Sequence, residues 1–209
     1  MKLAVLGATG RTGRLLVEQA LGQGHQIRAL VRNPEKLGTL RPKVETVAGD
    51  ATRAEDVERL VAGCDAVIST LGHTAGTSAD MQTTATRNVL HAMRRHGARR
   101  LISLTGAGVP DTHDEPGFVE KLFHVALRIF AKKVQEDAIR HAEAIRSSDL
   151  DWTIVRVPML RDGPGGHEIK VGYAGKGPGT KIERPDVARF MLQQLTDDEW
   201  VKKSPMISN

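Results

Sequence analysis

The strongest chemical signal in the sequence is a glycine-rich segment, GATGRTG, which begins at Gly7. A short apolar run precedes it and a helical pattern follows it, which is the context in which such a turn binds phosphate. Gly7 would let the chain turn out of a strand, Gly10 would let backbone approach a pyrophosphate, and Gly13 would let a helix pack closely on a sheet. Free N–H groups and the dipole at the helix start favour an anion. The alternative is a glycine-rich turn without a ligand, but the flanking elements favour a diphosphate bound by Gly7, Thr9, Gly10, Arg11, Thr12 and Gly13.

A second signal is the residue that ends the next apolar run. The segment LVRNP places Arg32 where an acidic residue would bind the ribose hydroxyls of NAD. A guanidinium there pairs with a 2′-phosphate, which a carboxylate would repel. Arg11 is a second candidate for the same phosphate, so the sequence favours NADP(H) over NAD(H). The alternative for Arg32 is a solvated loop arginine.

The elements that must position these residues alternate between short strand runs and helical patterns. Strands are expected at residues 3–6, 26–31, 44–48, 66–69 and 99–104, and helices at 14–21, 55–61 and 79–96, the last ended by Gly97. This alternation predicts an α/β fold with a doubly wound parallel sheet, a Rossmann fold, whose ligand crevice lies beside the first strand.

The second half of the chain has a different pattern. A long helical segment is expected within residues 118–148, a strand at 152–157 and a last helix at 186–195, opened by Pro185. The Gly- and Pro-rich segment between them is interpreted as a loop plus a hairpin around residues 168–173, and residues 205–207 as an edge strand. We therefore expect one domain, residues 1–209, with a small C-terminal substrate lobe formed mainly by residues 108–131 and 158–184.

Composition narrows the functional class. The 209 residues carry 30 Lys and Arg against 25 Asp and Glu, and aromatic residues make up only 3%, so neither a nucleic-acid partner nor a membrane is expected. The single cysteine, Cys64, excludes an internal disulfide, and the eight histidines lack metal-ligand spacing, so no metal is expected. The amino terminus lacks the pattern of a signal peptide, which makes a cytoplasmic protein the expectation.

The segments GATGRTG, VRNPEKL, VAGD, CDAVISTLG, ATRNVLHAMRRHGARRLISLTG and LDWTIVRVP together resemble a known family. They are similar to the atypical short-chain dehydrogenase/reductases, in particular the NAD(P)H-binding NmrA-like group and the biliverdin reductase B/flavin reductase type. The resemblance spans nearly the whole chain.

This resemblance implies roles for further residues. It implies that Asp50 accepts a hydrogen bond from the adenine amino group and that Thr105 faces the nicotinamide. The remaining cofactor contacts that it implies are Ala51, Leu71, Gly72, Gly106, Val157, Pro158 and Met159. The alternatives are that Asp50 caps the next helix, although Thr52 is better placed for that, and that Thr105 is an ordinary strand-end hydroxyl.

The chain lacks the usual proton-transfer pair of this superfamily. The only tyrosine is Tyr173, and Gly177, not lysine, follows it by four positions. Thr105 is too weak an acid to replace the tyrosine, so a positioning role is expected. Met159 also departs from the histidine of the biliverdin reductase B type. The histidines His73, His113 and His124 are possible proton donors, but each is more typical of a surface or a satisfied histidine. Lys132 and Lys133 are candidates for contact with an anionic substrate, but each is more typical of a solvated lysine.

These observations predict an NADPH-dependent oxidoreductase that transfers hydride to a planar, conjugated small molecule such as a flavin, a quinone or a tetrapyrrole-like compound. The alternative is a non-catalytic NADP(H)-binding redox sensor of the NmrA-like type. An epimerase-like enzyme has less support, because the C-terminal region is short and Arg156 and Arg161 are generic. A monomer and a homodimer both stay open.

Overall fold

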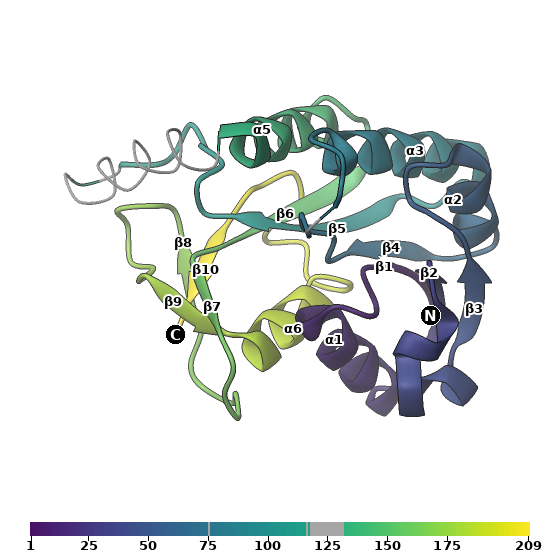
Figure 1. Ribbon diagram of the computed structural model, residues 1–209. Coiled ribbons are helices and arrows are strands. Elements are labelled where there is room, and N and C mark those ends of the chain that lie inside the picture. Colours follow the sequence, from purple (N-terminus) through teal and green to yellow (C-terminus); the bar gives the residue numbers. More distant parts are fainter. Residues whose placement is uncertain (75, 116, 118–131) are drawn as a thin grey trace.

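The computed structural model describes residues 1–74, 76–115, 117 and 132–209, and its centre is an eight-stranded sheet (Figure 1). The strands follow the order β3-β2-β1-β4-β5-β6-β10-β8. Their bounds are β1 Lys2–Leu6, β2 Gln26–Val31, β3 Glu45–Ala48, β4 Ala66–Ser69, β5 Arg100–Gly106, β6 Asp151–Val157, β8 Lys170–Gly172 and β10 Met206–Ser208. All pairs from β3 to β10 are parallel, and β8 is antiparallel to β10. The expected doubly wound Rossmann-like sheet is therefore confirmed.

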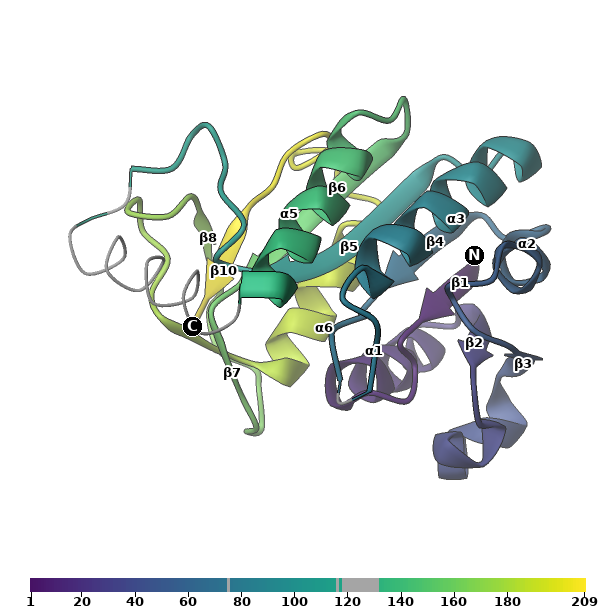
Figure 2. The same ribbon diagram turned by 45° about the horizontal axis from the view of Figure 1, so that its top comes forward.

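Helices cover both faces of the sheet. Figures 1 and 2 show α2 (Ala54–Val61), α3 (Met81–His96) and α5 (Lys132–Arg146) on one face, and α1 (Arg11–Gly22) and α6 (Arg184–Gln193) on the other. Side chains of β1 alternate between the two cores: Leu3 and Val5 pack with α1 and α6, whereas Leu6 packs with α2 and α3. Each fully buried leucine contributes about 1.5–3 kcal/mol, so both layers are fixed on the sheet.

The direction of strand order reverses beside β1. Leu3 pairs with Ile27 of β2 on one side and with Ala66 of β4 on the other. The connections after β1 and β4 therefore leave toward opposite faces, and the carboxyl ends of these strands are where a doubly wound sheet is expected to form its ligand crevice. This is the position that the sequence predicts for the ligand.

The C-terminal region differs from the sequence-based expectation. The tail is not an edge strand, because β10 lies between β6 and β8. The expected hairpin at 168–173 is also wrong: β8 pairs with β10, while β7 (Met159–Arg161) and β9 (Lys181–Glu183) form a separate parallel pair. Both errors concern pairing partners far apart in sequence, which local alternation does not identify.

Two helical expectations also change. A 3-10 segment, η1 (Pro34–Lys43), follows β2, where no element was predicted. The long helical pattern at 118–148 is described only as α5, and residues 118–131, which include His124 and part of the expected substrate lobe, lie outside the described residues. Among the residues that are described, no helix has the length and apolar character needed to cross a bilayer.

Candidate functional site

The turn between β1 and α1 has a shape that only glycine permits at two positions. Gly7 has a φ of +82°, and a Cβ there would lie 2.6 Å from Thr70 Oγ1. A Cβ on Gly13 would lie 2.1 Å from the Gly7 carbonyl oxygen. The Gly10 N–H donates to the same oxygen at 2.9 Å. The turn is thus folded tightly onto itself, and the start of α1 lies directly against the end of β1.

The outer side of this turn is open to an anion. Gly10 is the N-cap of α1 and makes no side-chain capping bond, and α1 itself has no acidic residue in its first turn. A Cβ on Gly10 would meet only the Gly7 carbonyl oxygen, at 3.2 Å. The first N–H groups of α1 have no acidic side chain of the helix beside them, and the space around Gly10 is open. The turn therefore fits the diphosphate predicted from the sequence. Thr9 is half-buried and Thr12 is buried beside these N–H groups.

Arg11 follows the turn and makes a contact that the sequence did not predict. Its guanidinium forms an ion pair with Asp162, with 3.1 Å between Nη1 and Oδ2. Asp162 follows β7, so this contact joins the glycine-rich turn to the C-terminal lobe.

The ends of β2 and β3 bring Arg32 and Asp50 into one neighbourhood. Arg32 is exposed, and its charge contributes to lowering the pKa of the Asp50 carboxyl. The larger causes of that low pKa are the Thr52 N–H, which donates to Asp50 Oδ1 at 2.9 Å, and then the Thr52 hydroxyl at 2.7 Å. The N-cap of α2 is Arg53, so the alternative that Asp50 or Thr52 caps this helix is wrong. Ala51, between them, is half-buried.

The segment after β4 is fixed by both neighbouring helices. The Leu71 carbonyl accepts a hydrogen bond from Gln82 Nε2 at 2.9 Å, and Gly72 is exposed. His73 Nε2 lies 2.8 Å from Asp137 Oδ2. His73 thus ties the segment to α5, in keeping with the prediction that it is a satisfied histidine.

Thr105, near the end of β5, carries an orphaned polar atom. The residue is 4% exposed, and its hydroxyl has no hydrogen-bond partner among the described residues. A buried hydroxyl without a partner is uncommon and calls for an explanation. Thr105 pairs with Arg156 of β6, and the exposed Gly106 follows it at the crevice edge. A bound polar group, such as a carboxamide, would satisfy this hydroxyl, and the glycine cradle would hold a diphosphate; these residues therefore fit a nicotinamide dinucleotide.

The end of β6 forms the next part of the rim. Val157 is buried, and its carbonyl accepts a hydrogen bond from the Ala107 N–H at 2.7 Å. Pro158 is half-buried, whereas Met159 is 68% exposed. The Met159 side chain is therefore accessible to a ligand at this end of β6.

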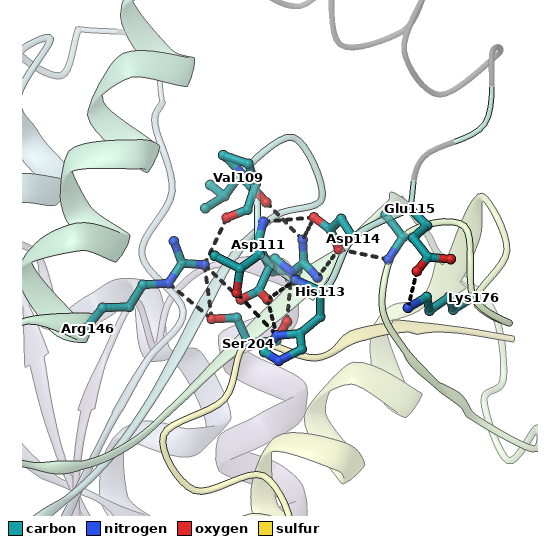
Figure 3. Close-up of polar contacts among 12 residues, drawn as sticks. Val109, Asp111, His113, Asp114, Glu115, Arg146, Lys176 and Ser204 are labelled. Atoms are coloured by element: carbon teal, nitrogen blue, oxygen red, sulfur yellow. Dashed lines mark hydrogen bonds and ion pairs between the residues drawn. The ribbon is translucent and has the colours of Figure 1, made fainter.

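An ionic network that sequence reasoning missed fixes the segment after β5 (Figure 3). The fully buried Arg156 forms two hydrogen bonds with Asp114, at 2.6 and 2.7 Å, and donates to the Val109 carbonyl at 3.0 Å. Arg146 bridges Asp111 and Ser204. Burial alone would raise the pKa of the Asp114 carboxyl, but the Arg156 hydrogen bonds keep it below its ordinary value. The signal that could have found this network is an arginine inside an otherwise apolar strand, because a buried charge needs a partner.

Tyr173, His113 and His141 contact other side chains of the protein. The Tyr173 ring lies 4.7 Å from the His113 ring and 6.1 Å from the Trp200 ring, and burial raises the pKa of its hydroxyl. Lys132 and Lys133 are exposed at the start of α5.

His141 is buried, with Thr86 Oγ1 2.5 Å from Nδ1 and Ser103 Oγ 3.3 Å from Nε2. Burial lowers the pKa of His141 to about 4, so it is neutral at pH 7. Within the described part of the chain, no group of three or more His, Cys, Asp or Glu side chains is arranged to hold a metal.

Comparison with known proteins agrees with a site that binds a nicotinamide dinucleotide. A family model described as NAD(P)H-binding matches residues 7–198. The uncharacterized chloroplastic protein At2g34460 of Arabidopsis thaliana is 30% identical over 212 residues, which cover 95% of this chain and 73% of that protein. Two other curated relatives match over less than a third of their own length.

Solved structures share the fold at low identity. ChuY, an anaerobillin reductase from Escherichia coli O157:H7, has a TM-score of 0.80 at 21% identity and covers 100% of this chain and 97% of its own. A short-chain dehydrogenase/reductase from Veillonella parvula, solved in complex with NADP, has a TM-score of 0.78 at 19% identity, with 100% and 94% covered. The family match confirms the NAD(P)H-binding part of the expected resemblance, and the solved structures confirm the expected fold.

Proposed function

The chain belongs to the NAD(P)H-binding family, and from that premise we propose that it is an NADPH-dependent reductase acting on a planar, conjugated small molecule. The observation that carries the proposal is a glycine cradle that fits a diphosphate, combined with a buried Thr105 hydroxyl near the end of β5 that has no hydrogen-bond partner among the described residues. The name of ChuY, a reductase with the same fold, supports the choice of a conjugated acceptor.

Each part of the site has a separate task in this proposal. The N–H groups around Gly10 bind the diphosphate, and Arg32 pairs with the 2′-phosphate, which selects NADPH over NADH. Asp50 and Ala51 border the adenine, while Leu71 and Gly72 pass the ribose. Thr105 and Gly106 orient the carboxamide beside Val157, Pro158 and Met159. When bound, the nicotinamide supplies the hydride, and the protein contributes orientation and exclusion of water.

The absent tyrosine–lysine pair determines the kind of acceptor. Tyr173, the only tyrosine in the sequence, is held among His113, Trp200 and Arg156. Because Gly177, not lysine, follows Tyr173 by four positions, the chain lacks the pair that protonates an alkoxide in this superfamily. A flavin, a quinone or a linear tetrapyrrole delocalises the electron pair that arrives with the hydride and takes its proton from solvent. Such acceptors need no acid from the protein, whereas aldehydes and ketones do.

The test is oxidation of NADPH by the purified protein with FMN, a benzoquinone, biliverdin or an aliphatic aldehyde as acceptor. We expect turnover with at least one conjugated acceptor and none with the aldehyde. If no acceptor raised the rate above background while NADPH still bound, the reductase proposal would be wrong. A difference between the NADP⁺ and NADPH affinities would then favour the redox-sensor alternative, because a sensor must bind its two ligands unequally.

A further inference from the structure

One carboxylate joins the glycine-rich turn to the C-terminal lobe through two arginines. Asp162 Oδ2 lies 3.1 Å from Arg11 Nη1, and Asp162 Oδ1 lies 2.7 Å from Arg184 Nη1. Arg11 is the first residue of α1 and Arg184 the first residue of α6. The bridge therefore spans the starts of two helices, one of which forms the diphosphate cradle.

The two halves of this bridge differ in strength. The Arg184 side chain is 8% exposed, whereas those of Arg11 and Asp162 are 72% and 68% exposed. A buried guanidinium needs its counterion, so Asp162 is fixed by Arg184. The exposed pair with Arg11 is screened by water and contributes little to stability. Arg11 is thus the partner that can leave.

The position of Asp162 is also fixed by the loop that follows it. The loop that it opens is held by the Gly165 N–H, which donates to Glu183 Oε2 at 2.8 Å, and by the Gly166 N–H, which donates to Asp186 Oδ1 at 2.9 Å. The base of α6 is in turn tied to α1, because Gln19 Nε2 donates to the Pro185 carbonyl at 3.0 Å. The carboxylate therefore stays beside the cradle while the Arg11 side chain is free to turn.

We propose that Asp162 holds Arg11 beside the cradle and that the diphosphate of a dinucleotide takes the guanidinium from it on binding. A diphosphate offers Arg11 more charge and more acceptor oxygens than a single carboxylate does. Asp162 then competes with the ligand for Arg11 and sets the affinity of the site. This inference rests on the proposed binding of NADPH, and Asp162 acts in it as a positioning residue.

The test is a calorimetric titration of NADPH into the wild-type protein, R11Q, D162N and the double variant. We expect R11Q to weaken binding about 10-fold or more, since it loses a charge-assisted hydrogen bond. D162N should tighten binding about 2- to 5-fold, because the competitor of the ligand becomes neutral while the amide oxygen still accepts a hydrogen bond from Arg184; a thermal midpoint close to that of the wild type checks that the lobe stays folded. In the R11Q background the same substitution should have a smaller effect. The matched control is E168Q, which removes one exposed negative charge from the same lobe and should leave the affinity unchanged.

The outcomes separate this inference from the proposed function. If the wild-type protein does not bind NADPH, the proposed function fails. If it binds, but D162N weakens binding, leaves it unchanged or acts equally in both backgrounds, the exchange of partners is wrong. A second measurement needs no change at Asp162: the NMR signal of the Arg11 Nε–H, assigned through R11Q, should move when NADPH saturates the wild-type protein. A signal that stays in place would also overturn the exchange.

Discussion

Thr105 is the residue where stability and binding make opposite demands. Its buried hydroxyl has no partner among the described residues, so the folded protein loses hydration there without regaining a hydrogen bond. We expect Thr105→Val, which keeps the shape, to raise the free energy of unfolding by up to about 1 kcal/mol and to weaken NADPH binding. Thermal unfolding and calorimetry measure the two effects. Loss of stability in Thr105→Val with unchanged affinity would assign the hydroxyl a structural role instead.

Arg32 is the residue that we propose selects NADPH over NADH. Its exposed side chain lies at the end of β2, beside Asp50. Arg32→Asp should weaken NADPH binding about 10- to 100-fold, since it replaces a charge-assisted hydrogen bond with repulsion, and should favour NADH. The control is Arg41→Asp, which makes the same change of charge in η1. Equal selectivity in Arg32→Asp and the wild-type protein would contradict this role.

At the residue scale, the sequence predicted what depends on neighbours along the chain. The positive φ of Gly7 and the close approach of Gly13 follow from the spacing of the turn. The partners of Arg11 and Arg156 did not follow from it, because Asp162 and Asp114 are distant in sequence and their choice depends on the packed lobe. The sequence showed that Arg156 was charged but not which acid would neutralise it.

At the element scale, helix α3 is capped from another helix. Its own N-cap, Asp80, makes no side-chain capping bond. Instead, Asp137 of α5 accepts hydrogen bonds from the N–H groups of Gln82, at 2.8 Å, and Thr83, at 3.2 Å. Burial alone would raise the pKa of this carboxyl, but the Thr83 hydroxyl and these N–H groups keep it low. The same carboxylate holds His73, so one side chain joins α3, α5 and the segment after β4.

We expect Asp137→Asn to lower the free energy of unfolding by about 1–3 kcal/mol, because the amide NH₂ would face N–H donors. Chemical denaturation measures this loss. Asp149→Asn removes an exposed carboxylate that pairs with Arg94 and should leave the stability close to that of the wild type. Similar losses in both variants would mean that the capping role is unimportant.

The pattern of elements was predictable through β6, except for η1 between β2 and β3, and the observed order β3-β2-β1-β4-β5-β6 is doubly wound, as expected. The expectation failed for the C-terminal strands, whose partners lie far away in the sequence. β10 enters the sheet between β6 and β8, although its sequence, MIS, is too short to indicate two neighbours. Its burial on both sides comes from the assembled sheet, which no local pattern reports.

At the scale of the whole molecule, buried His141 makes stability depend on pH. Burial lowers its pKa from 6.5 to about 4, an effect only partly opposed by the charge of Asp137. Between these two values the unfolded chain binds a proton that the folded protein does not. Stability is therefore full above pH 6.5 and falls as the pH drops toward 4, by roughly 3 kcal/mol.

The check is chemical denaturation of the wild-type protein and His141→Gln across this range. Glutamine can still bond Thr86 and Ser103 but does not titrate. The difference between the two proteins should grow in favour of the variant as the pH falls. A constant difference would show that His141 is protonated in the folded protein or accessible to water.

Our central proposal is that the turn between β1 and α1 binds the diphosphate of NADPH, because the rest of the site depends on this contact. Calorimetric titration of NADPH into the wild-type protein and Gly10→Ala tests it most directly, because a methyl group at Gly10 occupies the open side of the cradle and meets only the Gly7 carbonyl oxygen. We predict that the wild-type protein binds and that Gly10→Ala, with a thermal midpoint close to that of the wild type, does not bind measurably. Equal binding by both proteins, or no binding by the wild type, would contradict the claim.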